Sequence, residues 1–534
     1  MRSDRRFRSA LWGLILAAAV PAAQAGSLAA QATSNVPLDD PAYVDLDALV
    51  SAGLTAPVHV GQRPWSRLTF ARLAASVPEE AVLSPRQGEA LARLRERFGS
   101  EGEGAVAAPG VRFREVRADA TWADSPWREI PSRVAGGQQI DGSVNPLLQG
   151  QEGRPLVDGW TLGVEPSVEA RPAPGLVVVA RPRLQYAGPR GADEDGDVGV
   201  HTLYARGAVG NVAFQVGRDH LFWGQGAAAG LMVSDNARGL DMIRVGNERP
   251  FRLPWLFRYL GPTRLTQVIA DMGADRDIPH SKVFLTKASF LPHPDLEVGI
   301  GLLNQQLGEG APEAPFWERV ADLTWVLDLF MTSGDFEISD KLVVADVRWR
   351  VAPGFALYGE AGFTDIDFRR IGDFGTHDAA YLAGVDLSGL GSEGRWSGAF
   401  EVHYTGIIYA NHGQFTTGHT LDRVLMGDPL GPAGRAVRAR VNRDDPDRRI
   451  GMHVSRESRS TDTWSKDADF HWVRRVDAPE EVRKRFVLGW EERPGSRNLA
   501  LSAVLGVERA SHFAFTDQTR TNFFGQLVLT RRWR

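Results

Sequence analysis

Charged, polar and aromatic side chains are concentrated in one stretch, residues 214–262. Arginines pair bidentately with carboxylates, and tryptophan rings offer flat apolar faces. An alternative is that these residues lock a folded loop, with glycines serving tight turns. A structural role is favoured for any single residue, while ligand contact by the whole segment stays open. The candidate binding residues are Arg218, Asp219, His220, Trp223, Ser234, Asp235, Asn236, Arg238 and Trp255.

Motifs of known enzymes are matched only in part. Ser234-Asp235-Asn236 is one element of penicillin-binding enzymes, but the chain has no Lys-Thr-Gly. Gly224-x-Gly226 lacks the spacing and the βαβ surroundings of a dinucleotide site. For His403 and His419 we expect no carboxylate or hydroxyl partner arranged as in a barrel phospholipase. We therefore predict a binding protein without catalytic residues; the alternative, a lipid hydrolase, would lose activity on a single serine or histidine change.

Metal and cofactor sites have weak support in the sequence. Asp193, Asp195 and Asp197 around Gly196 resemble a calcium loop, yet the glutamate expected at the twelfth position is missing. We interpret 193–197 as a solvated external loop, with weak calcium binding as the alternative. The chain has no cysteine, which excludes disulfides and thiolate metal sites. We expect no metal ligands and no cofactor.

The elements that position these residues have a repeat of two. From about residue 111, apolar residues alternate with polar or small ones, as in the segments beginning at Trp160, Leu176, Trp396, Phe486 and Leu499. Such segments are typical of a lipid-embedded antiparallel barrel, whose closure pairs every backbone group. A soluble sandwich or propeller also alternates, but no blade-length repeat is present and the region is long for a sandwich. We predict a transmembrane β-barrel over residues 111–534.

The connections between the first predicted strands alternate in length. Links at 124–158, 187–198 and 218–262 are long, whereas 172–175 and Gly210-Asn211 are tight turns. Outer-membrane barrels have short periplasmic turns and long external loops. This pattern places the candidate binding residues outside the cell. Later in the chain the alternation is less clean and does not fix the number of strands.

The first residues predict export. Four of the first eight residues are arginines, and the apolar run Ala10–Val20 follows them. Ala23-Gln24-Ala25 and Ala30-Gln31-Ala32 each offer a small-x-small cleavage pattern, so cleavage after Ala25 or after Ala32 remains open. The apolar run is shorter than the roughly 20 residues needed to span a bilayer. We assign residues 1–25 to a signal peptide and expect the mature chain in the outer membrane of a double-membrane bacterium.

Residues 40–99 have a helical repeat instead. The third candidate helix is the best bounded, because Ser84 and Gln87 form a capping box and Gly99 closes the helix. Three short helices bury little apolar area alone, so we expect this periplasmic segment to dock on another part of the protein. Residues 100–110 are interpreted as a linker. The candidate helices run from Asp40 to Gly53, from Pro64 to Val77 and from Ser84 to Gly99.

The end of the chain and its charge agree with a membrane barrel. Phe523, Leu527, Leu529 and Trp533 share one face of the predicted last strand, although Arg531 interrupts this face. An interfacial arginine can extend to the lipid headgroups, so lipid and the barrel-insertion machinery are expected partners. The net charge of −5 indicates neither a nucleic-acid partner nor a basic surface for anionic lipid.

The block at 214–262 resembles the capsule assembly Wzi family of outer-membrane proteins. The similarity lies in a strand ending in Gly217-Arg218, a Trp223-Gly-x-Gly turn, Ser234-x-Asn-Ala and a following Ile243-x-Val strand. Weaker similarities cover nearly the whole mature chain. They are Asp45 to Leu54, Arg63-Pro64-Trp65, His403-Tyr404-x-Gly406, Gly418-His419 and Asp428-Pro429-Leu430-Gly431.

The resemblance implies an 18-stranded barrel with a periplasmic helical bundle. It further implies a lectin-like protein that attaches capsular polysaccharide or a related exopolysaccharide to the cell surface. In that role the candidate binding residues would contact sugar: Trp223 and Trp255 would stack on sugar rings, and the arginines would pair with uronate carboxylates. The arginine-rich termini and Arg531 depart from the family pattern and leave the identity of the polysaccharide open. The alternative is a transport channel, whose open pore would be lined by Arg181, Arg183, Asp346, Arg348 and Arg350.

Overall fold

The structure is a computed structural model. It describes residues 32–533 except 103–108, 125–127, 130–132, 135–137, 140–142, 145–148, 174, 324–337, 365–376, 468–471, 477 and 493–497. The predicted signal peptide and most of the predicted linker lie outside the described residues.

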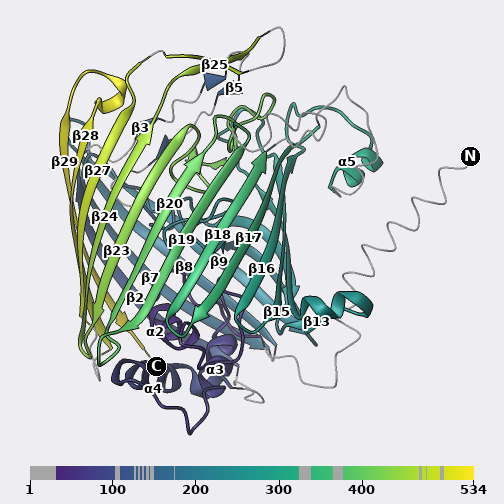
Figure 1. The fold of residues 1–534 in the computed structure, drawn as a ribbon, viewed down its shortest axis with the longest axis vertical. Helices are drawn as coiled ribbons and strands as arrows, with labels where there is room; N and C mark the ends of the chain where they lie inside the picture. The colour runs from purple at the N-terminus through teal and green to yellow at the C-terminus, as the bar shows by residue number, and fades with distance from the viewer. Residues whose placement is uncertain are drawn as a thin grey trace, which may run out of the picture.

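The main body is a closed antiparallel β-barrel, in which the first strand, β2, pairs with both β7 and the last strand, β29 (Figure 1). Because β12 and β13 both pair with β14 as one interrupted strand, the described residues form 18 strands. The predicted fold class is confirmed. The strands are β2 (Gly110–Ala123), β7 (Gly159–Ala173), β8 (Leu176–Pro189), β9 (Asp195–Val209), β10 (Val212–Asp219), β12 (Leu240–Asn247), β13 (Phe251–Arg252), β14 (Pro262–Asp271), β15 (Lys282–His293), β16 (Leu296–Gln306), β17 (Asp340–Ala352), β18 (Phe355–Thr364), β19 (Ala379–Leu390), β20 (Trp396–Thr405), β23 (Gly434–Asp444), β24 (Arg448–Arg459), β27 (Glu481–Glu492), β28 (Leu499–Ser511) and β29 (Arg520–Arg532).

The outer face of the barrel is apolar and its lumen is polar over much of its length. In β7, Trp160, Leu162 and Val164 are 55%, 42% and 43% exposed. Thr161 and Glu165, which alternate with them on the other face, are each 1% exposed. A water-soluble sheet would bury its apolar residues, so this outward face is suited to hydrocarbon. Strands β8, β20 and β27 repeat the arrangement, as the alternation in the sequence predicted.

The two ends of the barrel differ. Neighbouring strands are joined by tight turns at the end that carries the helices, for example at 210–211 and 353–354 (Figure 1). The opposite end carries the longer connections, including 220–239 and 406–433. Long loops mark the external end of an outer-membrane barrel. This end of the barrel is called the outer end below.

Two predicted connections were wrong in extent. The link at 187–198 is shorter than predicted because β8 continues to Pro189 and β9 begins at Asp195, so Asp195 and Asp197 lie in a strand. The link at 218–262 contains β12 and β13. The chain therefore returns to the helical end of the barrel and leaves it again within this stretch.

Three helices form the predicted segment ahead of the barrel: α2 (Ala42–Val50), α3 (Arg67–Ala75) and α4 (Pro85–Phe98). The capping box of Ser84 and Gln87 begins α4 as predicted. Ser66 is the N-cap of α3, two residues after Pro64, where the sequence placed the start of this helix. At the start of α2, the Asp40 carboxylate accepts a hydrogen bond from the Ala42 N–H. No helix among the described residues is long and apolar enough to cross a membrane.

The helical segment docks on the barrel, as its small size predicted. Its core contains Trp65, Phe70 and Phe98, all fully buried. Glu89 of α4 is paired with Arg395 between β19 and β20 (2.8 Å), and Arg350 of β17 donates to the carbonyl of Val50 (2.7 Å).

The remaining short elements are η1 (Gly99–Glu101), η2 (Trp255–Leu260), α5 (Phe316–Asp322), η3 (Phe513–Phe515), β1 (Gln62–Arg63), β3 (Arg128–Glu129), β4 (Arg133–Val134), β5 (Gln138–Gln139), β6 (Ser143–Val144), β11 (Phe222–Trp223), β21 (Thr420–Leu421), β22 (Val424–Leu425), β25 (Thr463–Lys466) and β26 (Trp472–Arg475).

Candidate functional site

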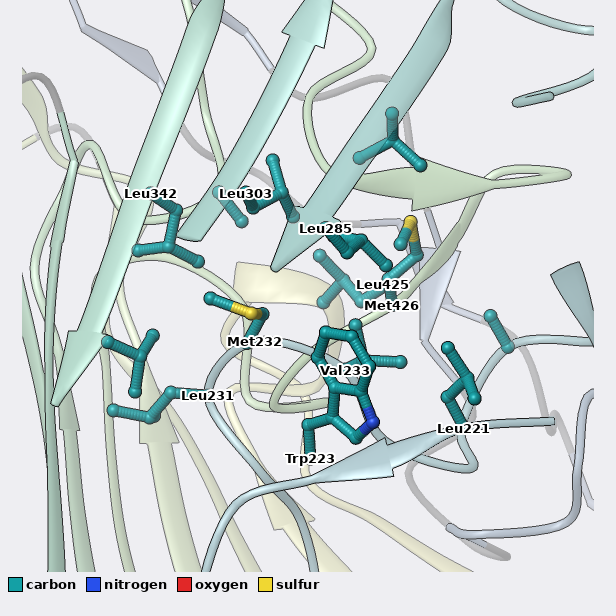
Figure 2. Packing of buried hydrophobic residues seen from close by; sticks show 14 of the residues in the cluster. Leu221, Trp223, Leu231, Met232, Val233, Leu285, Leu303, Leu342, Leu425 and Met426 are labelled. Carbon is teal, nitrogen blue, oxygen red and sulfur yellow. The ribbon is translucent and has the colours of Figure 1, made fainter. Parts of the chain in front are cut away.

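Residues 220–239, here called the plug segment, fold from the end of β10 into the barrel and return at β12. Within the lumen β11 pairs with β1 of the N-terminal segment, Gln62 opposite Trp223. Leu231, Met232 and Trp223 are at most 2% exposed and form an apolar core with the surrounding wall (Figure 2). The plug segment is therefore packed like a protein interior. The wall residues of this core are Met242, Val268, Ala270, Val283, Leu285, Leu303, Leu342, Val344, Tyr358, Ala380 and Leu382.

A second outer loop, 406–433, fastens the plug segment. The Ser234 hydroxyl donates to the carbonyl of Gly427 (2.7 Å), and the Asn236 amide donates to the carbonyl of Leu425 (2.9 Å). In the opposite direction, the Tyr409 hydroxyl donates to the carbonyl of Leu231 (2.6 Å). Buried polar groups are costly unless they are paired, so these bonds fix the two loops together.

Inward-facing carboxylates on the strands hold the backbone of the plug segment. Glu360 of β18 accepts N–H bonds from Gln225 (2.6 Å), Gly226 (3.0 Å) and Leu231 (2.9 Å). Glu401 of β20 accepts one from Ala227 (2.5 Å). Sequence reasoning missed both glutamates. The available signal was their position on the polar face of an alternating strand.

The rest of the lumen wall is ionic. Arg183 of β8 contacts Asp119 of β2 (2.8 Å) and Glu165 of β7 (2.7 Å), and Arg438 of β23 contacts Glu457 of β24 (3.1 Å). The charges proposed to line an open pore are likewise paired. These pairs are Arg181 with Glu165, Arg183 with Asp119, Asp346 with Lys287, Arg348 with Asp386 and Arg350 with Asp295.

Arg218 and Arg238 lie at the outer ends of β10 and β12 and remain partly exposed. Both contact Asp241: Arg218 bidentately at 2.8 and 2.7 Å, and Arg238 at 3.2 Å. Arg238 also pairs with Asp422 of the second outer loop. A further exposed pair joins Arg423 of the second outer loop to Asp275 of the connection between β14 and β15 (3.2 Å). We call these residues the outer patch: Arg218, Arg238, Asp241, Asp275, Asp422 and Arg423.

Asp219 and His220, like Ser234 and Asn236, are buried and face the interior instead, and Asp235 is half-buried. Asp219 accepts hydrogen bonds from the amides of Asn35 (2.7 Å) and Gln215 (2.8 Å). His220 is buried, with its Nε2 3.2 Å from the carbonyl of Glu152. At Asp235, burial, together with the charge of Glu152, raises the pKa to about 7. The expectation that the whole set lies on the external loop surface was therefore wrong for these residues.

The two predicted sugar-stacking tryptophans are not brought together. Trp223 is 1% exposed within the apolar core. Trp255 is 86% exposed and is the first residue of η2, which ends beside Gly261. A Cβ at Gly261 would meet the carbonyl of Leu291, which lies near the tight turn that joins β15 and β16. Trp255 is therefore at the helical end. Neither ring is exposed at the outer end.

His403 and His419 each have a carboxylate partner; the sequence predicted only that no partner is arranged as in a barrel phospholipase. The His403 Nδ1 lies 2.5 Å from Asp428, and His419 Nε2 lies 3.0 Å from Asp340. Both histidines are buried. Asp428 belongs to the second outer loop, so its contact with β20 adds another link between this loop and the wall.

A family model described as "Capsule assembly protein Wzi" matches residues 134–523 of the chain. Wzi of Escherichia coli, described as a carbohydrate-binding β-barrel involved in group 1 capsule assembly, has 16% identity and a TM-score of 0.67 over 94% of this chain and 100% of its own. OccD3 of Pseudomonas aeruginosa has 11% identity and a TM-score of 0.42 over 80% of this chain and 95% of its own.

A sequence relative comes from Klebsiella pneumoniae, an uncharacterized 55.8 kDa protein in the cps region. It is 30% identical over 159 residues, which span 28% of this chain and 30% of the relative. With a family match extending from residue 134 to residue 523 and a closed barrel in the structure, the chain is an outer-membrane protein that belongs to the capsule assembly protein Wzi family.

Proposed function

We propose that this barrel binds capsular polysaccharide, or a related exopolysaccharide, at its outer end and thereby attaches the polymer to the cell surface. One observation carries the proposal: the plug segment is sealed to the apolar wall by a packed core, so the outer loops offer a binding surface in place of an open pore. Family membership supports it, because the Wzi protein of Escherichia coli is described as carbohydrate-binding. The proposed role is that of a lectin, without catalysis.

The outer patch is the part of the predicted site that fits an acidic polysaccharide. The arginine side chains of Arg218 and Arg238 are 25% and 20% exposed, and their partners Asp241 and Asp422 are 42% and 49% exposed. Ion pairs this exposed contribute little to stability. The arginines can therefore exchange an aspartate for a uronate carboxylate, keeping bidentate geometry.

A glycan-binding assay with the host's own surface polymer tests the proposal. Hydrogen bonds to charged groups contribute about 1.5–3 kcal/mol, so Arg218→Gln and Arg238→Gln should each weaken binding roughly 10- to 100-fold. Arg258→Gln in η2, at the helical end, is the matched control and should leave affinity unchanged. Equal affinity of all variants would refute the assignment of the outer patch.

Two further measurements separate attachment from transport. Deletion of the protein should leave polymer synthesis intact while releasing polymer into the medium; loss of synthesis would contradict the proposal. In planar bilayers the purified barrel should show little conductance, because the plug segment occupies the lumen. Large, stable open channels would instead favour the transport alternative.

A further inference from the structure

Three potential metal ligands, none of them a residue of the outer patch, meet in the lumen. The donor atoms of Glu152, His201 and His220 all lie within 4.8 Å of one another. The Nε2 of His201 is 2.9 Å from the Glu152 carboxylate, and the two imidazole rings are 4.7 Å apart. All three residues are buried, with exposed fractions of 1%, 7% and 5%. Two imidazoles and one carboxylate form a donor set suited to Zn²⁺.

The two histidines come from the barrel wall and from its junction with the plug segment. The pairing of β9 with β10 ends with Arg218 opposite Leu203, and His220 follows the last residue of β10. The pairing of β8 with β9 shifts register between Thr202 and Val200, so His201 lies at a β-bulge. A bulge re-aims a side chain, and here His201 is buried although Leu203, two residues along the strand, is 46% exposed.

Glu152 reaches the histidines through an unusual backbone. Its φ is 53°, and the glycines on either side of this turn, Gly150 and Gly153, have φ of 67° and 64°. A Cβ at Gly153 would lie 2.1 Å from the backbone nitrogen of Arg238, so the turn is pressed against the plug segment. The Glu152 N–H also donates to the carbonyl of Asp235 (2.7 Å).

The Glu152 carboxylate is paired with a neighbouring cation, Arg154. Arg154 contacts Glu152 at 3.2 Å, but it also contacts Glu165 at 2.8 Å and Asp39 at 3.2 Å. A metal ion can thus replace the Arg154 contact without leaving this arginine unpaired.

The cluster is reached from a cavity of about 500 Å³ whose lining includes Glu152, Asp219 and His220. A cavity of this size admits a hydrated ion and leaves space for water as a fourth ligand. We propose that Glu152, His201 and His220 bind a divalent transition-metal ion of the zinc type, which clamps the 150–153 turn to the wall formed by β9 and β10. This proposal replaces the sequence-based expectation of no metal ligands, and it is independent of polysaccharide binding.

Metal analysis of the purified full-length barrel tests the site. After chelator treatment and dialysis against Zn²⁺, the protein should retain one equivalent, and Ca²⁺ or Mg²⁺ should not displace it because only one ligand is an oxygen. His201→Gln, His220→Gln and Glu152→Gln should each weaken Zn²⁺ binding by more than the roughly 10- to 100-fold lost with an outer-shell partner. His419→Gln, which alters a different buried histidine–carboxylate pair, is the matched control.

A measurement on the unaltered protein guards against misfolded variants. X-ray absorption of the Zn²⁺-loaded barrel should show two imidazoles among nitrogen and oxygen neighbours at about 2.0–2.1 Å. Zn²⁺ should also raise the melting temperature of the parent and of His419→Gln, but not of the three ligand variants. Absence of stoichiometric Zn²⁺ in the parent, or its loss on His419→Gln alone, would overturn the proposal.

Discussion

Trp223 provides the sharpest test of the interpretation that the plug segment is structural. Its type and position predicted a sugar-stacking ring, whereas the structure places it at 1% exposure in the core that joins the plug segment to the wall. The substitution Trp223→Ala removes this ring without altering a residue of the outer patch. We expect it to release the plug segment, which includes Arg238, and to leave Arg218 of β10 in place.

The magnitude follows from the burial. Replacing a fully buried tryptophan by alanine costs about 3–5 kcal/mol, from lost transfer energy and the cavity that remains. Since each 1.4 kcal/mol is a factor of ten, the open state of the plug segment should be populated roughly a hundred- to several-thousand-fold more. The barrel itself should persist, because its strands stay paired around the closed ring.

Planar-bilayer conductance is the assay, with limited proteolysis of the plug segment as a second readout. Trp223→Ala should show frequent channel openings and faster cleavage within 220–239. Trp255→Ala is the matched control, since that ring is 86% exposed at the helical end. It should behave as the parent in both assays and in glycan binding.

A variant Trp223→Ala with parental conductance and proteolysis but lost glycan affinity would refute this reasoning. It would show that the ring contacts sugar. The reasoning would also be refuted if Trp255→Ala, and not Trp223→Ala, released the plug segment.

Ser234→Ala removes the bond to the Gly427 carbonyl, so it should weaken the junction of the two loops by about 1–3 kcal/mol and speed proteolysis of 406–433. Gly153→Ala should destabilise the barrel by more than the roughly 1–2 kcal/mol that a left-handed alanine costs, because its Cβ would also meet Arg238. Gly191→Ala, with φ of 76° and no atom within 4 Å of its Cβ, carries only the conformational cost in the same thermal melt. Burial raises the pKa of Asp40, but the charge of Arg97 outweighs burial and holds this pKa well below its ordinary value. The Asp40–Arg97 pair therefore stabilises the fold fully above about pH 3.9, and this stabilisation is lost as pH falls toward the lower folded pKa. Asp40→Asn should abolish that acid-dependent loss, measured by proteolysis of the helical segment; an unchanged pH profile would contradict it.

Features set by short-range patterns could be predicted from the sequence. The alternation at Trp160, Leu162 and Val164 depends only on the strand repeat, and the capping box of Ser84 and Gln87 depends on spacing within one helical turn. Both were found where expected. The resemblance in residues 214–262 supplied the strand number, which the alternation alone did not fix.

The interior location of the candidate site could not be predicted in this way. Burial of Trp223 depends on an apolar wall assembled from distant strands, including Leu285 and Leu303. The displacement of Trp255 to the helical end depends on β12, which the sequence reading included in one long link. Likewise, the approach of His201 to His220 involves a β-bulge at His201, which the alternation of residue types does not reveal.

The pairing of β2 with β29 has a consequence for how this protein can change. Because every strand is antiparallel to its neighbours, β28 runs in the same direction as β2, and a chain that ends before β29 cannot close the ring in the antiparallel manner. Its two unpaired strand edges would face hydrocarbon, where each backbone group without a hydrogen bond costs several kcal/mol. A truncated product is therefore expected to fail completely and not to form a narrower barrel. Evolution can resize this wall only by gaining or losing whole hairpins.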